Sequence, residues 1–134
     1  MKAVIHNNAD AAKVHNAYPV EWARLNEEAV KEYGNIDDTV YFLRSGGALS
    51  PSHSSLFWLG DQLTSWDGFD GIKTVVLGMI SSGISGFSFT HSDIGGYTAV
   101  PQFGYRRSKE LFMRWCELAA FTVWGLTVYG TSLP

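Results

Sequence analysis

Apolar positions recur at helical spacing in three parts of the chain. In segment 19–33 (PVEWARLNEEAVKEY), large side chains return every three or four residues between an opening proline and a closing glycine. Segment 72–82 has the same period, with Asp67 at the expected N-cap and Asp70 three residues later. Segment 108–121 is the third. Its common apolar face consists of Leu111, Trp115, Leu118 and Ala119. The pattern predicts three amphipathic helices.

Short, mainly apolar runs separate these helices, and the first two of them lack polar alternation. They are segments 39–43 (TVYFL), 56–59 (LFWL) and 84–89 (ISGFSF), which are rich in β-branched and aromatic residues. Such runs are typical of strands that are buried on both faces, as in parallel sheets. The order helix, strand, strand, helix, strand, helix therefore predicts an α/β fold with a parallel sheet.

Polar clusters follow each predicted strand, at positions 44–47, 60–62 and 91–97. Because ligand sites of parallel α/β sheets lie at the carboxyl ends of the strands, the three clusters are expected to meet. Arg44 is either a solvated cation or a group that holds a ring hydroxyl or steadies a carboxylate. Asp93 either forms a turn with the glycines after it or accepts hydrogen bonds from a polyhydroxylated ligand.

Asp61 follows the apolar run LFWL in the segment LFWLGDQ, and its role has two interpretations. It opens a turn after a strand, as Gly-Asp pairs often do. Alternatively, aromatic walls disfavour its charged form, which would make it a candidate general acid.

Composition narrows the function classes. The chain has 134 residues, a net charge of -3 and 17% charged residues, and the Arg106-Arg107 pair is an isolated surface feature. A nucleic-acid partner is therefore not expected. The lone Cys116 and the absence of clustered histidines predict no metal and no cofactor. No apolar run is long enough to cross a membrane and no signal peptide is visible, so a cytoplasmic or organelle-interior location is expected.

Three runs of the sequence resemble glycoside hydrolase family 31. They are FLRSGGALSPSHSSLFWLGDQLTSWDGFDGIKTVV, SGFSFTHSDIGGYTA and RRSKELFMRWCELAAFT, which together cover most of residues 15–122. The chain looks most similar to the α-glucosidase and sulfoquinovosidase branch. The resemblance implies that residues 1–134 form the C-terminal part of a (β/α)8 catalytic barrel. It also implies retaining hydrolysis of α-O-glycosidic bonds in carbohydrate metabolism.

The family pattern also implies roles for individual residues. Asp61 matches the general acid/base of the W-x-G-D motif, and four positions match substrate-binding residues: Arg44, Trp58, Asp93 and Tyr97. Tyr97 falls where sulfoquinovosidases have a tyrosine near the sulfonate, and a tyrosine at this position is also compatible with α-glucosidases. The nucleophile is expected on an earlier barrel strand, ahead of segment 19–33, and Val128 stands near the position of a family histidine.

This chain therefore lacks the nucleophile and the histidine that the family pattern implies, and these two departures leave alternatives for its function. It is expected to be an incomplete barrel whose exposed edges promote self-association. One alternative is an inactive, truncated module that binds sugar or another subunit. Another is a two-carboxylate site formed by Asp61 and Asp93, which the family use of the second position disfavours.

Overall fold

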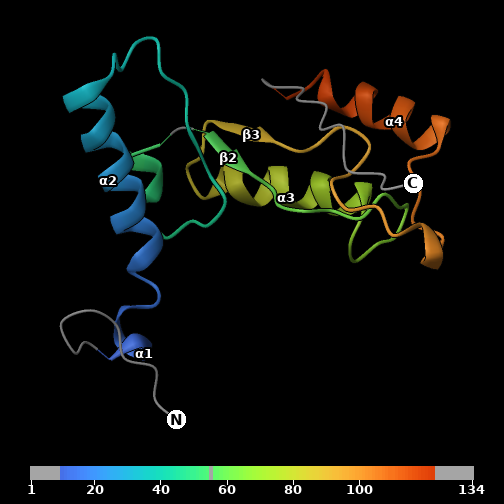
Figure 1. Cartoon of the computed structure of the whole chain (residues 1–134), viewed down its shortest axis with the longest axis horizontal. Helices are drawn as coiled ribbons and strands as arrows, with labels where there is room; N and C mark the ends of the chain where they lie inside the picture. The colour runs from blue at the N-terminus through green and yellow to red at the C-terminus, as the bar shows by residue number, and fades with distance from the viewer. Residues whose placement is uncertain (1–9, 55, 123–134) are drawn as a thin grey trace.

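The computed structural model describes residues 10–54 and 56–122 (Figure 1). The elements in chain order are α1 (Ala11–Val14), α2 (Tyr18–Tyr33), β1 (Phe42–Leu43), β2 (Leu56–Trp58), α3 (Ile72–Ile84), β3 (Phe89–His91) and α4 (Lys109–Ala119). Two 3-10 turns, η2 (Ser50–Ser52) and η3 (Pro101–Phe103), lie in the connections. The predicted order of three helices and three strands is confirmed, and the short α1 precedes it.

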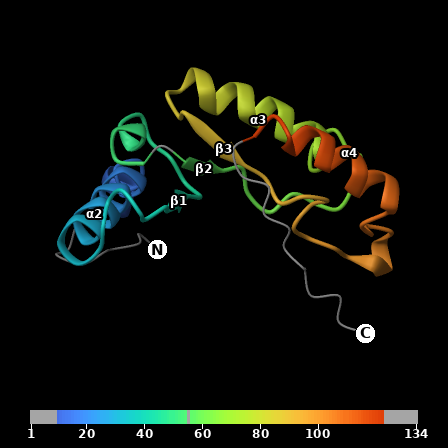
Figure 2. The ribbon, with the colours of Figure 1, turned by 90° about the horizontal axis from the view of Figure 1, so that it is seen from above.

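The three strands form one parallel sheet in the order β1-β2-β3. Phe42 pairs with Leu56, and Trp58 of β2 pairs with His91 of β3. Helices α3 and α4 lie along the same side of β2 and β3, while α2 lies near β1 at the other end (Figure 2). Parallel strands with helices on their outer side are the unit from which a (β/α)8 barrel is built. The prediction of an α/β fold with a parallel sheet is confirmed.

The last predicted helix agrees closely with α4. Ser108 is its N-cap, and the Ser108 side chain accepts a hydrogen bond from the backbone N–H of Leu111 at 3.2 Å. Leu111, Trp115 and Ala119 are buried on one face. They pack with Val75 of α3 and Ile94 of the loop after β3. The 3.6-residue period of this segment therefore identified a true core face.

Helix α2 has the predicted bounds within one residue, but its apolar face is largely uncovered. Ala23 is the buried residue of this helix, whereas Trp22 and Leu25 are each 52% exposed. Ala23 packs with Leu43 and Phe87 in a second, smaller core. The sequence period predicted the helix correctly, but the predicted apolar face is exposed, Ala29 and Tyr33 included, and the buried Ala23 lies on a different side of the helix.

Helix α3 begins at Ile72 as predicted, but its N-cap differs from the prediction. Gly71 is the N-cap, and Asp67 instead accepts hydrogen bonds from the backbone N–H groups of Phe69 and Asp70 at 2.7 and 3.0 Å. These bonds hold the pKa of the Asp67 carboxyl below its usual value. Asp70 accepts from the backbone N–H of Leu63. The two acids therefore shape the turn before the helix, because their oxygens satisfy loop amides rather than helix amides.

Two predicted strands have different bounds in the structure. Segment 84–89 was expected to be a strand, but Ile84 is the last residue of α3, and β3 begins at Phe89 after a turn with Gly86 at φ 100°. Apolar runs of this length fit either a strand or a buried helix end, so period alone did not separate them. The strand predicted at 39–43 is reduced to two residues, and Phe42 is 50% exposed rather than buried.

Candidate active site

The polar clusters predicted at the strand ends meet at one edge of the sheet. Arg44 directly follows β1, Asp61 follows β2 by three residues, and Asp93 follows β3 by two. Arg44 Nε lies 3.7 Å from Asp61 Oδ1, with the two side chains 66% and 41% exposed. The structure thus places a carboxylate and a guanidinium side by side in contact with solvent. One interpretation of the sequence expected aromatic side chains to enclose Asp61. Among the described residues, its side chain is instead open to solvent.

Trp58, the last residue of β2, connects the members of this cluster. The Arg44 guanidinium carbon lies 5.8 Å from the centre of the Trp58 ring, within the range of a cation–π contact. Tyr97 meets the same indole edge-on, with the ring centres 5.8 Å apart, and Phe42 does so at 6.2 Å. A charged group and two rings from two different segments, β1 with the residue after it and the loop after β3, therefore gather around one indole.

Asp93 lies beneath this aromatic group rather than at its surface. The residue is 3% exposed. Its Oδ2 accepts a hydrogen bond from Trp58 Nε1 at 2.9 Å, and its Oδ1 lies 3.4 Å from His91 Nε2. The contacts Arg44–Asp61, Arg44–Trp58, Trp58–Asp93 and Trp58–Tyr97 join all five residues that the sequence singled out into one connected cluster.

Backbone contacts fix the loops that carry Asp61 and Asp93 against each other. The N–H groups of Tyr97 and Thr98 both donate to the carbonyl of Gln62, at 2.9 and 3.0 Å, and the Thr98 hydroxyl donates to the carbonyl of Asp61. Gly96 lies at this crossing with φ 87°, where a Cβ atom would come within 2.8 Å of the Leu63 carbonyl oxygen. The Gly-Gly pair therefore permits a close approach of two loops.

Substitution of Gly96 by alanine is expected to destabilise the fold more than the same change at Gly104. Both glycines have left-handed φ values, 87° and 83°, so each alanine has a similar conformational cost of about 1 kcal/mol. Only at Gly96 does the added methyl group meet backbone, since nothing lies within 4 Å at Gly104. Urea unfolding of the two variants measures the difference. Equal midpoints would contradict the close approach of the loops.

Two residues of this region were missed or undervalued in the sequence. Arg107, expected to be a surface feature, donates from Nε to the Gly95 carbonyl at 3.3 Å and from Nη2 to the Gly96 carbonyl. His91, the first residue of the polar cluster 91–97, is 3% exposed and lies against Asp93. Neither role had a sequence signal, since both depend on which carbonyl or carboxylate the fold brings close.

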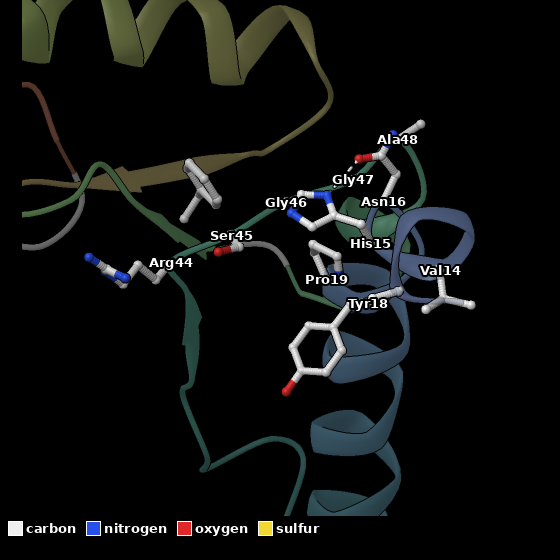
Figure 3. A pocket seen from close by; sticks show the side chains of 12 residues that line it. Val14, His15, Asn16, Tyr18, Pro19, Arg44, Ser45, Gly46, Gly47 and Ala48 are labelled. Atoms are coloured by element: carbon white, nitrogen blue, oxygen red, sulfur yellow. Dashed lines mark hydrogen bonds between the residues drawn. The ribbon is translucent and has the colours of Figure 1, made fainter. Parts of the chain in front are cut away.

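A separate hollow of about 850 Å³ lies on the other side of Arg44. Tyr18 and Pro19 at the start of α2 and residues 44–48 line it, and Arg44 points away from His15 and Asn16 (Figure 3). Neither Asp61 nor Asp93 lines this hollow. Its size alone does not make it the site of chemistry, because the convergent charged groups lie at the sheet edge instead.

Two general properties of the described residues bear on the class of protein. They contain no group of three or more side chains suited to hold a metal ion. Within residues 10–54 and 56–122, no helix has the length and apolar character needed to cross a membrane.

Asp10, near the start of the described chain, caps α1 by accepting a hydrogen bond from the backbone N–H of Ala12.

A parallel α/β sheet with a carboxylate, an arginine and aromatic rings at its strand ends is typical of the barrel class of protein, whose sites lie at the carboxyl ends of the strands. The family comparison agrees with this class. Residues 1–124 match the model of the glycosyl hydrolases family 31 TIM-barrel domain. The chain belongs to glycoside hydrolase family 31, as its resemblance to that family implied.

Individual relatives give a narrower picture. The chain is 42% identical over 118 residues to the sulfoquinovosidase of Escherichia coli K12, and 43% identical over 118 residues to that of Agrobacterium fabrum C58. These matches cover 88% of the chain but only 17% and 18% of the two relatives. A solved structure of a family 31 sulfoquinovosidase from E. rectale superposes with a TM-score of 0.86 at 45% identity, covering 95% of this chain and 19% of that one.

Proposed function

We propose that this chain supplies the acid/base half of the active site of a retaining family 31 α-glycosidase. The observation that carries the proposal is the contact between Arg44 and Asp61 at 3.7 Å, set at the carboxyl ends of two paired parallel strands. The Asp61 side chain is 41% exposed, and its contact among the described residues is the ion pair with Arg44. A sugar oxygen can therefore reach it.

The chemistry assigned to Asp61 is proton transfer to the leaving glycosidic oxygen, followed by activation of water. Arg44 keeps the carboxyl group oriented through the ion pair, and the Trp58 and Tyr97 rings offer apolar surface to the sugar ring. A retaining mechanism also needs a carboxylate nucleophile about 5–5.5 Å from the acid. Asp93 is a poor candidate because it is 3% exposed and its Oδ2 already accepts a hydrogen bond from Trp58 Nε1. We assign the nucleophile to a part of the barrel outside the described residues.

The substrate class proposed for the whole enzyme is α-sulfoquinovosides, in which the glucose unit carries a sulfonate. Two sulfoquinovosidases match at 42% and 43% identity over 88% of the chain. Tyr97 stands where the family resemblance implies a tyrosine near the sulfonate. It is 42% exposed and its ring contacts the Trp58 indole. Its hydroxyl can donate a hydrogen bond to an anionic oxygen.

A chimera tests both the chemistry and the substrate class. In it, this chain replaces the matching segment of the Escherichia coli sulfoquinovosidase, and the hydrolysis of 4-nitrophenyl α-sulfoquinovoside and 4-nitrophenyl α-glucoside is compared. We expect the chimera to turn over the sulfoquinovoside with a kcat/KM at least about 100-fold above that of the glucoside. Tyr97→Phe should reduce this ratio, because it removes the hydroxyl and keeps the ring. Tyr33→Phe, on the exposed end of α2, is the matched control.

The same experiment distinguishes the other functions considered. A chimera that prefers the glucoside would assign the segment to an α-glucosidase. A folded chimera without turnover of either substrate would contradict the acid/base assignment. It would favour instead an interaction module, for which the exposed rings of Phe42 and Phe89 at the two edge strands provide apolar surface. A defined oligomer of the isolated chain in light scattering would then support that second function.

A further inference from the structure

Asp93 is the acidic side chain that the fold encloses most completely among the residues described. At 3% exposure its oxygens need polar partners within the protein in place of the water that they have lost. Trp58 Nε1 donates to Oδ2 at 2.9 Å, and His91 Nε2 lies 3.4 Å from Oδ1. A short hydrogen bond to a carboxylate is roughly twice as strong as one between neutral groups, so the bond from Trp58 is a strong constraint on the indole.

The indole that Asp93 constrains is the shared contact of the site. Arg44 lies 5.8 Å from its ring centre and Tyr97 5.8 Å on another side. A rotation of the Trp58 ring would therefore displace both Arg44 and Tyr97. Because Arg44 is the ion-pair partner of Asp61, the rotation would also disturb that pair. Since an indole has a single N–H donor, the bond to Asp93 also leaves only the ring surface of Trp58 for a ligand.

We propose that Asp93 is a positioning residue, which together with His91 fixes the orientation of the Trp58 indole and so holds Arg44 beside Asp61. This role differs from the direct sugar contact that the family resemblance implies for Asp93. His91 enters because its Nε2 faces the second carboxylate oxygen and keeps the group from rotating away from Trp58. The significance for catalysis rests on the proposed function, whereas the positioning itself rests on contacts within the chain.

Indole N–H signals of the 134-residue chain test the proposal without requiring enzymatic turnover. The chain has five tryptophans, and Trp58→Phe and Trp115→Phe assign the two signals that matter. In Asp93→Ala, the Trp58 indole proton is expected to move upfield and to exchange with solvent at least about tenfold faster. Asp93→Asn should give a smaller change in the same direction, because its amide oxygen still accepts a hydrogen bond but carries no charge.

Trp115 provides the internal control, since its indole N–H donates to Ser92 Oγ at 3.0 Å, one residue from Asp93. Its signal should stay in place in both Asp93 variants and move in Ser92→Ala, which leaves the Trp58 signal unchanged. If Asp93→Ala fails to fold, seen as loss of the Trp115 signal from its folded position, Asp93→Asn decides. A Trp58 signal with unaltered position and exchange rate in the folded variant would overturn the proposal. Failure of the chimera to hydrolyse glycosides would leave these signals unaffected.

Discussion

The Asp61→Asn chimera is expected to hydrolyse a methyl α-glycoside about 100- to 10,000-fold more slowly than the parent chimera. Methoxide is a poor leaving group and depends on a proton from Asp61, which an amide cannot supply. 4-Nitrophenolate leaves readily without a proton, so the first step with an aryl glycoside should be affected much less. Initial rates with the two substrates, measured side by side, show whether the loss follows the leaving group.

The control for this substitution is Asp37→Asn, which makes the same chemical change in the exposed connection between α2 and β1. It should leave both rates unchanged. An Asp61→Asn variant that loses the same factor with both leaving groups would contradict the acid/base role. It would point instead to a defect in binding or folding, because removal of Asp61 also leaves Arg44 without the ion-pair partner seen here.

Trp115→Ala is expected to lower the free energy of unfolding by about 3–5 kcal/mol. The side chain is fully buried at 0% exposure and packs with Val75, Ile94 and Leu111 in the larger core. Its loss leaves a cavity, and it also removes the buried donor of the Ser92 hydroxyl. Because small domains have only about 5–15 kcal/mol in total, this single change can remove most of the stability.

Urea unfolding of the isolated chain, followed by circular dichroism, measures the loss. Trp22→Ala is the matched control, since that indole is 52% exposed on α2 and its removal should change the free energy by less than about 0.5 kcal/mol. Similar midpoints for the two variants would show that α4 does not pack on α3 as described. The result also concerns the site, because Trp115 anchors Ser92 directly before Asp93.

The hollow beside Arg44 and the cluster around Trp58 share one residue and differ in character. The hollow has Pro19, Phe57 and the glycines of the loop after β1 in its wall. The cluster has charged groups at hydrogen-bonding and ion-pair distances. Arg44 extends from the hollow toward Asp61, so the loop 45–48 that shapes the hollow also bears on the position of the guanidinium.

Much of the fold follows from local pattern. Segments 19–33 and 108–121 carry a 3.6-residue apolar period with clear start signals, and they became α2 and α4 within two residues at each end. The strand Leu56–Trp58 was recognisable because it is aromatic and lacks polar alternation. The parallel sheet followed from the order of elements, and with it the meeting of Arg44, Asp61 and Asp93 at one edge.

The boundaries that the sequence placed wrongly are those where neighbours compete for the same residues. Ile84 suits a strand or a helix, and it is the last residue of α3 because the chain turns only at Ser85 and Gly86. Asp67 has the chemistry of an N-cap, but loop amides lay closer to its oxygens than helix amides did. In both cases local chemistry allowed two outcomes.

The sequence by itself determined the family, the order of the elements and which residues would gather at the strand ends, because each is written in local spacing and motif. Only the tertiary structure decided how those residues interact. It buried Asp93 beneath Trp58, left Asp61 open beside Arg44, and brought Arg107 onto the carbonyls of Gly95 and Gly96. Burial and pairing of charged groups depend on contacts between segments up to 35 residues apart, such as Trp58 with Asp93, which no local pattern encodes.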